Sequence, residues 1–347
     1  DTIKEVKDTT KHILSDCIFS PNLGFGYRRL SILDLSSNGH QPMSNIDGSL
    51  WIEYNGEIYN YIELKEELLQ KGYKFKSATD TEIILNAYQE WGFDCLNRFN
   101  GMWSFALWDS NKKILFCARD RFGVKPFYYY IDSNKFVFAS EIKAILQDTS
   151  IKREINEPLI YDYFILNLID HTNETFFKNI YNLPQSHYLV VDNTGLKINR
   201  YYDLSYNDEL EEFEEKKLNL YSKQLKELLY DSVKLRFRAD VPVGSCLSGG
   251  LDSSSIVCLG KNILSNSNVN NIDKLQHTFS AVYDNEKISE KKYIDIILEK
   301  TGVNGYFVYP NAEILSNEIG KFIYHLDEPF LSTSMYAQWN VMRLARE

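Results

Sequence analysis

The sequence contains few cysteines and no paired cysteine motif. The five are odd in number: Cys17, Cys95, Cys117, Cys246 and Cys258. This usage argues against a disulfide framework or a structural zinc site and fits a reducing cytoplasm. The sequence also lacks a run of about 18 apolar residues that would cross a membrane, and its charged first residues do not resemble a signal peptide. We therefore expect a soluble cytoplasmic protein.

Basic residues are outnumbered, with 38 Lys and Arg against 48 Asp and Glu and a net charge of −10. Such a balance disfavours a surface that coats nucleic acid, so we expect no nucleic-acid partner. No internal repeat or low-complexity tract occurs. A chain of 347 residues exceeds one ordinary hydrophobic core, which predicts two domains.

A stretch rich in glycine and hydroxyl groups occupies residues 248–254, Ser-Gly-Gly-Leu-Asp-Ser-Ser. An apolar segment (241–247) typical of a buried strand precedes it, and a helical pattern (256–264) follows. Backbone N–H groups, hydroxyls and a helix dipole together favour a phosphate at this point. Asp252 would repel phosphate unless Mg²⁺ bridged the two.

This stretch is not a Walker A loop, because no lysine follows the glycines. It resembles the pyrophosphate loop of ATP pyrophosphatases, which include asparagine, GMP and NAD synthetases and tRNA-thiolating enzymes. A serine-rich turn that only caps a helix is the structural alternative. The motif alone does not choose among these enzymes.

Short apolar strands and turns alternate up to about residue 200, which predicts a mixed domain with mainly antiparallel sheets. The acidic segment 206–217 predicts a linker, although its charges also suit the start of a helix over 218–235. The expected strands are 30–33, 50–54, 102–108, 114–118, 136–139 and 188–191, and the expected helices are 61–71, 80–91 and 157–166.

Seven ordered blocks stand out in this half: YRRLSIL (27–33), GHQPM (39–43), YNGEIYN (54–60), TDTE (79–82), NGMW (100–103), ARDRFGVKP (118–126) and ASEIKA (139–144). Together they resemble the glutaminase domain of glutamine-hydrolysing asparagine synthetases. The resemblance implies an N-terminal Ntn-type αββα sandwich of the class II amidotransferases, followed by a parallel-sheet α/β nucleotide-binding domain of the PP-loop type. We expect them at residues 1–205 and 206–347.

Residues of these blocks suit the hydrolysis of glutamine. The Asn55 side chain and the Gly56 N–H would supply two donors to an oxyanion. The Arg29 guanidinium has paired N–H donors that suit the α-carboxylate of glutamine, while Glu57 and Asp80 offer negative charge for its α-ammonium. The structural alternatives are a hairpin turn at Asn55-Gly56, a surface ion pair for Arg29 and a helix N-cap at Asp80. The predicted glutamine-binding residues, several by resemblance alone, are Arg29, Leu30, Ser31, Ile32, Leu33, Asn55, Gly56, Glu57 and Asp80.

The second domain should contain strands near 243–247, 278–282 and 306–308, with ATP above their carboxyl ends. By resemblance, the backbone around Cys246 and Ala281 would line the adenine, and Asp252 would take Mg²⁺. The run Asp327-Glu328-Pro329 is a further candidate, with a helix stop before proline as its alternative. The predicted ATP-binding residues are Cys246, Ser248, Gly249, Gly250, Leu251, Asp252, Ser253, Ser254 and Ala281.

Two departures from the family pattern accompany the resemblance. The family's nucleophile is a cysteine at the mature N-terminus, yet this sequence begins with Asp1 and Cys17 is internal. The family's His-Arg-Gly-Pro-Asp segment is matched only by His12 and Asp16. The sequence also stops before the family's second glycine-rich, acid-bearing loop. We expect a sequence cut at both ends, without the first glutaminase strand and the end of the synthetase domain; a decayed glutaminase is the alternative.

The function predicted from these features is asparagine synthesis. Aspartate would react with ATP to β-aspartyl-AMP, ammonia from glutamine would displace AMP, and the products would be asparagine, AMP and pyrophosphate. The implied cofactors and partners are ATP, Mg²⁺, glutamine and aspartate, with a homodimer as a further expectation. We expect no glutamine-dependent synthesis from residues 1–347 alone. The alternatives are an ammonia-dependent enzyme, an amide former like β-lactam synthetases or lasso-peptide cyclases, and an inactive glutamine-binding homologue.

Overall fold

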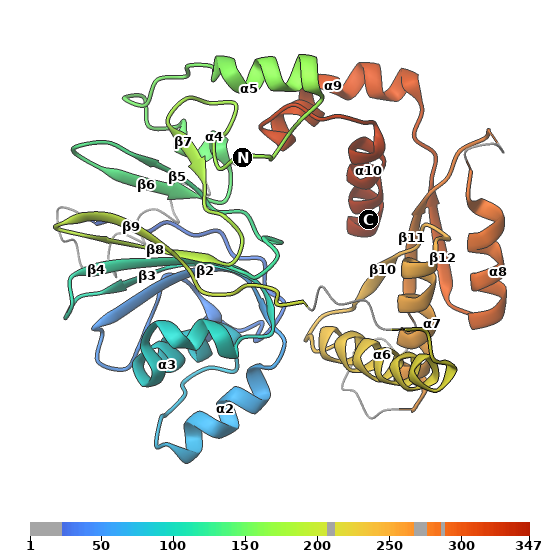
Figure 1. Ribbon diagram of the computed structural model, residues 1–347, viewed down its shortest axis with the longest axis horizontal. Helices are drawn as coiled ribbons and strands as arrows, with labels where there is room; N and C mark the ends of the chain where they lie inside the picture. Colours follow the sequence, from blue (N-terminus) through green and yellow to red (C-terminus); the bar gives the residue numbers. More distant parts are fainter. Residues whose placement is uncertain (1–22, 207–211, 267–275, 286–288) are drawn as a thin grey trace. The chain divides into compact units, whose positions relative to one another are not determined.

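The structure, a computed structural model, describes residues 23–206, 212–266, 276–285 and 289–347. The chain forms two compact units (Figure 1). Unit 1 consists of Asp1–Lys125 and Gln185–Tyr202, and unit 2 consists of Pro126–Pro184 and Asp203–Glu347. Within the described ranges, no helix has both the length and the apolar character needed to cross a membrane.

Unit 1 is built on a six-stranded antiparallel sheet in the order β1-β2-β3-β4-β8-β9. Side chains alternate between its two faces, and Ile52, Tyr54 and Ile58 are buried on one of them. These three side chains belong to the main apolar core of the unit. The strands are β1 (Met43–Ser44), β2 (Leu50–Ile58), β3 (Gly101–Asp109), β4 (Ile114–Arg119), β8 (His187–Asp192) and β9 (Gly195–Arg200).

The helices α2 (Tyr61–Gln70) and α3 (Asp80–Trp91) cover one face of this sheet (Figure 1). The Thr79 hydroxyl caps α3 by accepting the Glu82 N–H at 3.4 Å. Asp80 is therefore the first residue of the helix and not its N-cap, so that structural alternative is wrong. The described part of the unit also contains two short 3₁₀ helices, η1 (Ser37–Gly39) and η2 (Gly92–Arg98).

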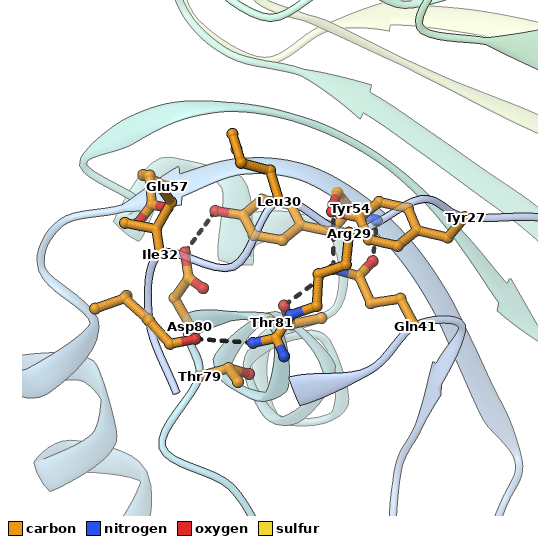
Figure 2. Close-up of a pocket in the computed structure, with 12 residues that line it drawn as sticks. Tyr27, Arg29, Leu30, Ile32, Gln41, Tyr54, Glu57, Thr79, Asp80 and Thr81 are labelled. Atoms are coloured by element: carbon orange, nitrogen blue, oxygen red, sulfur yellow. Dashed lines mark hydrogen bonds between the residues drawn. The ribbon is translucent and has the colours of Figure 1, made fainter. Parts of the chain in front are cut away.

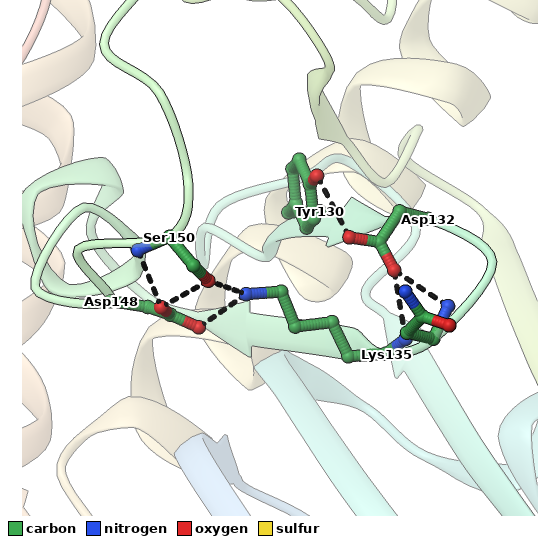
Figure 3. A network of polar contacts seen from close by, with 6 residues as sticks. Tyr130, Asp132, Lys135, Asp148 and Ser150 are labelled. Carbon is green, nitrogen blue, oxygen red and sulfur yellow. Dashed lines mark hydrogen bonds and ion pairs between the residues drawn. The ribbon is translucent and has the colours of Figure 1, made fainter.

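Unit 2 contains a three-stranded antiparallel sheet in the order β6-β5-β7. The Asp132 carboxylate closes the turn between β5 and β6 by accepting the N–H groups of Asn134 at 2.7 Å and Lys135 at 2.9 Å (Figure 3). The Lys135 ammonium then bonds Asp148 at 2.6 Å and the Ser150 hydroxyl. The elements are β5 (Tyr128–Ile131), β6 (Phe136–Ala139), α4 (Ile142–Ile145), α5 (Glu157–Tyr161), the π-helix η3 (Asp162–Leu166) and β7 (Ile180–Asn182).

A three-stranded parallel sheet, β10-β11-β12, forms the second sheet of unit 2. Cys246 pairs with Phe279, and Ala281 pairs with Val308, so the carboxyl ends of the strands lie at one edge. The strands are β10 (Gly244–Cys246), β11 (His277–Ala281) and β12 (Asn304–Val308), and the helices are α6 (Glu215–Arg236), α7 (Leu251–Asn266), α8 (Lys291–Thr301), α9 (Ala312–Leu326) and α10 (Ser334–Arg346).

The predicted fold class is confirmed, because antiparallel sheets are followed by a parallel sheet. The predicted strand at 30–33 is wrong: this backbone is irregular, and the carbonyl of Leu33 accepts from the Arg29 side chain. The predicted helix over 157–166 changes to a π-helix after Tyr161. The sequence analysis did not predict β1, β5, β7 or β9.

The hairpin alternative for Asn55-Gly56 is also wrong, since these residues lie inside β2 and pair with Ser104 and Trp103. The predicted linker, 206–217, lies partly outside the described residues, and α6 begins within it at Glu215. His12, Asp16 and Cys17 lie outside the described residues as well. The four described cysteines are free: Cys95, Cys117, Cys246 and Cys258.

Candidate functional site

The open edge of β2 is the centre of the candidate site in unit 1. The strand β1 pairs only with Trp51 and Ile52, so β2 continues beyond it. The side-chain amide of Gln41 takes the place of a partner strand at Tyr54. Its oxygen accepts the Tyr54 N–H at 2.6 Å, and its nitrogen donates to the Tyr54 carbonyl at 3.2 Å.

Asp80 occupies the other end of this edge. Its carboxylate accepts the Ile58 N–H at 2.8 Å and the Tyr54 hydroxyl at 2.7 Å. Backbone N–H groups of alternate residues in an antiparallel strand point to the same side. The N–H of Gly56, two residues from both Tyr54 and Ile58, therefore points to the open edge between the two occupied positions.

No side chain fits at Gly56. A Cβ atom there would lie 2.6 Å from the Trp103 Cα and closer still to the Met102 carbonyl oxygen. A pocket opens beside this edge (Figure 2). The lining residues are Tyr27, Arg29, Leu30, Ile32, Leu33, Gln41, Tyr54, Gly56, Glu57, Thr79, Asp80 and Thr81.

Two carboxyl groups, Glu57 and Asp80, set the electrostatics of this pocket. Burial raises the pKa of both side chains above its ordinary value. The charge of Asp80 raises the pKa of Glu57 further, whereas Lys125 lowers it. Hydrogen bonds from Ile58 and Tyr54 oppose the effect of burial at Asp80. A bound cation would favour the ionised form of both groups, so the pocket suits a ligand that carries an ammonium group.

The Arg29 guanidinium holds together the loop in which it lies. It donates to the carbonyls of Leu33 at 2.9 Å, Asp34 at 2.5 Å and Ser36 at 2.8 Å. These hydrogen bonds hold residues 29–36 in a bent loop beside the pocket, and Arg29 also lines this pocket. A ligand carboxylate would therefore share the N–H donors of Arg29 with three carbonyl groups.

The structure brings most of the predicted glutamine-site residues to one pocket. Those that line it are Arg29, Leu30, Ile32, Leu33, Gly56, Glu57 and Asp80, whereas Ser31 and Asn55 are not among its lining residues. The sequence analysis missed Tyr27, Gln41, Tyr54, Thr79 and Thr81. All five lie inside the blocks that carry the resemblance, so their place in those blocks is the signal that identifies them.

The serine- and glycine-rich loop of unit 2 follows β10 and leads into α7. The hydroxyls of Ser248 and Ser253 lie 3.0 Å apart, and the Gly250 N–H donates to Ser248 at 3.3 Å. Gly249 has a φ of +87°, and a Cβ atom there would lie 3.0 Å from that of Tyr293. Hydroxyls, backbone N–H groups and the start of a 16-residue helix form a donor set that fits phosphate.

Cys246 ends β10 and Ala281 ends β11, so both lie at the carboxyl edge where ligands of α/β sheets bind. Asp252 lies in the first turn of α7 and is exposed. In the part of the chain that the structure describes, no three His, Cys, Asp or Glu side chains group as metal ligands. A Mg²⁺ ion at Asp252 would take its remaining ligands from phosphate and water, which is usual for this ion.

The run Asp327-Glu328-Pro329 follows the end of α9 at Leu326, as the helix-stop alternative predicts. Asp327 pairs with Lys143 at 3.1 Å, and the Glu328 carboxylate accepts the Phe176 N–H at 2.8 Å. Burial raises the pKa of Glu328 to about 7. These contacts give both acids a structural role within unit 2.

Comparisons with known proteins match both halves of the chain to known domains. Residues 10–202 match a glutamine amidotransferase domain, and residues 224–347 match an asparagine synthase domain. A Methanocaldococcus jannaschii protein, provisionally named a glutamine-hydrolysing asparagine synthetase 2, is 39% identical over 342 residues. The match covers 94% of this chain and 64% of that protein.

Asparagine synthetase [glutamine-hydrolyzing] 1 of Bacillus subtilis is 33% identical over 328 residues, with 94% of this chain and 49% of the relative covered. The chain thus spans about half to two thirds of these relatives' lengths. A solved B. subtilis glutamine phosphoribosylpyrophosphate amidotransferase with ADP and GMP is 17% identical with a TM-score of 0.35, covering 81% of this chain and 54% of that one. The two domain matches and their order show that the chain belongs to the family of glutamine-hydrolysing asparagine synthetases.

Proposed function

We propose that the protein forms asparagine from aspartate and ATP, with glutamine as the nitrogen donor. The observation that carries this proposal is the pocket on the β2 edge, where two carboxyl groups lie beside a backbone N–H that points to the open edge. An amino acid with an amide side chain has an ammonium group for the acids and a carbonyl for the N–H.

In unit 1, Glu57 and Asp80 bind the α-ammonium of glutamine, and Arg29 binds its α-carboxylate. The Gly56 N–H and the Asn55 side chain donate to the amide oxygen and stabilise the negative charge that develops there. Segment 30–33, which includes Ser31, encloses the ligand. The lining residues include no cysteine, so the proposal for them covers binding and polarisation of the amide.

In unit 2, the loop 248–254 holds the phosphates of ATP, and the backbone around Cys246 and Ala281 lines the adenine. The aspartate side-chain carboxylate attacks the α-phosphate, the bond to pyrophosphate breaks, and β-aspartyl-AMP forms. Ammonia then attacks the activated carbonyl carbon, and AMP leaves as asparagine forms. Mg²⁺ at Asp252 would neutralise phosphate charge.

We also propose the domain division at residues 205 and 206, which the matched ranges 10–202 and 224–347 support. A homodimer and a cytoplasmic location stay predictions from the sequence.

The test supplies aspartate, ATP, Mg²⁺ and either amide-labelled ¹⁵N-glutamine or ¹⁵N-ammonium, and it measures AMP, pyrophosphate and labelled asparagine. In a version of the protein with the full length of its relatives, we expect pyrophosphate release that depends on aspartate and is lost in Asp252→Asn. AMP formation with a peptide or an N-acyl amino acid but not with aspartate would contradict the proposal in favour of a β-lactam synthetase or cyclase. Glutamine binding without turnover of either nitrogen source would leave an inactive binding protein.

A further inference from the structure

Glu53 is a buried acid of β2 that the proposed function leaves without a role. Its Oε1 atom is buried and has no hydrogen-bond partner in the described part of the chain. The residue opposite on β3 is Ala106, which is opposite Cys117 on β4, so neither cross-strand neighbour offers a strong donor. A buried polar atom without a partner is rare and calls for an explanation.

The position of Glu53 relates it to the glutamine pocket. Side chains of alternate strand residues share a face, so Glu53, Asn55 and Glu57 lie in one row. Neighbours in this row are about 6.6 Å apart, because a strand rises about 3.3 Å per residue. The Gly56 N–H, at the open edge, lies between Glu53 and Glu57 along the strand.

Other groups face the same region. The Tyr27 hydroxyl is close enough to Arg29, Asp80, Glu53 and Glu57 to interact electrostatically with each of them. Tyr27 comes from the segment before η1, Asp80 from α3 and Glu57 from β2 itself. Glu53 does not itself line the pocket, but it interacts with Tyr27, which lines the pocket together with Glu57 and Asp80. Glu53 is therefore a third acid near this pocket.

We propose that Glu53 is a specificity-determining residue that makes the pocket favour a carboxamide side chain over a carboxylate, and so glutamine over glutamate. The inference rests on the proposed binding of glutamine at this pocket. A ligand whose carbonyl accepts the Gly56 N–H places its side-chain end between Glu53 and Glu57. A γ-carboxylate meets like charge there, whereas a neutral γ-carboxamide does not.

This selectivity depends on pH. Burial raises the pKa of Glu53 to about 8, so the group is mostly neutral at pH 7 and ionised at pH 9. Its repulsion of a γ-carboxylate is therefore weak at pH 7 and strong at pH 9. The α-ammonium is common to glutamine and glutamate and favours ionised Glu57 and Asp80 in both complexes. Because Glu57 and Asp80 stay ionised in both complexes, they change the ratio of the two dissociation constants by a constant factor, and the change of this ratio with pH reports on Glu53.

The experiment measures the binding of L-glutamine and L-glutamate to the whole chain by calorimetry between pH 6.5 and 9. We expect the ratio of the glutamate Kd to the glutamine Kd to rise about tenfold from pH 7 to pH 9. A tenfold change corresponds to a repulsion of about 1.4 kcal/mol between the γ-carboxylate and one buried like charge. Glu53→Gln should keep glutamine affinity but give a ratio that does not change with pH. The matched control Glu66→Gln, at an exposed position of α2, should behave like the wild type.

A rising ratio in Glu53→Gln, parallel to that of the wild type, would overturn the inference while leaving glutamine binding intact. A flat ratio in the wild type would overturn it even if the variant does not fold. If the wild type binds glutamine at no pH, the proposed function fails as well, and the two failures are thereby distinguished.

Discussion

Replacing Glu53 by glutamine should stabilise the protein increasingly as the pH rises. The pKa of this carboxyl group is about 8 in the folded protein, against an ordinary value of 4.5. The cause is burial, which removes the charged form from water. Glutamine has nearly the same shape and does not ionise, so the variant isolates the cost of the charge.

The sign follows from proton binding. Between pH 4.5 and about 8 the folded state holds the Glu53 proton more tightly than the unfolded state, so stability falls as the pH rises through this window. Below this pH window the Glu53 carboxyl group is protonated in both states, and its burial causes no charge-related loss of stability. Each tenfold change in proton affinity is worth about 1.36 kcal/mol. The stability lost through the raised pKa of Glu53 is therefore about 2 kcal/mol at pH 6 and approaches ~5 kcal/mol at pH 9, as an upper limit.

Urea unfolding at pH 6 and pH 9 measures this difference. Tryptophan fluorescence reports mainly on unit 1, because four of the tryptophans lie there: Trp51, Trp91, Trp103 and Trp108. We expect Glu53→Gln to exceed the wild type by about 3 kcal/mol more at pH 9 than at pH 6. The exposed control Glu66→Gln should show no such difference. An equal effect of Glu53→Gln at both pH values would refute the reasoning.

Three further predictions concern other parts of the chain. Gly56→Ala should destabilise unit 1 by about 1–3 kcal/mol, because the new Cβ atom overlaps β3. Gly26→Ala, where the space around the glycine is open, is the control in the same urea assay. Equal destabilisation by the two substitutions would contradict the overlap at Gly56. Asp80→Asn should weaken glutamine binding in calorimetry about 10- to 100-fold, as expected for a charged hydrogen bond; unchanged affinity would remove Asp80 from the ligand's ammonium. Lys135→Met should raise the Asp148 pKa from about 2 toward 3.8, because the Lys135 hydrogen bond is the largest cause of its depression; a carboxyl ¹³C NMR titration that still gives about 2 would contradict the contact.

The sequence by itself determined the local elements that carry the two sites. Alternation of apolar residues predicts the strand at 50–54, and apolar residues at helical spacing predict the helix 80–91 with the bounds that the structure has. A strand and a helix flank the glycines of this stretch as predicted, but α7 begins at Leu251, earlier than the helical pattern at 256–264 indicates, so residues 251–254 form its first turn. These features depend on residues a few positions apart, and local patterns therefore specify them.

Only the tertiary structure decided which of these residues meet and in what environment. Gln41 completes the edge of β2 through contacts that span 13 positions, which no periodicity signals. Arg29 bonds its own loop, so residues 30–33 do not form the strand that their composition suggests. The buried state of Glu53 was also not predictable, because β-strand alternation says which residues share a face but not what covers that face. Burial, strand register and the pKa shifts that follow from them are set by packing between distant segments.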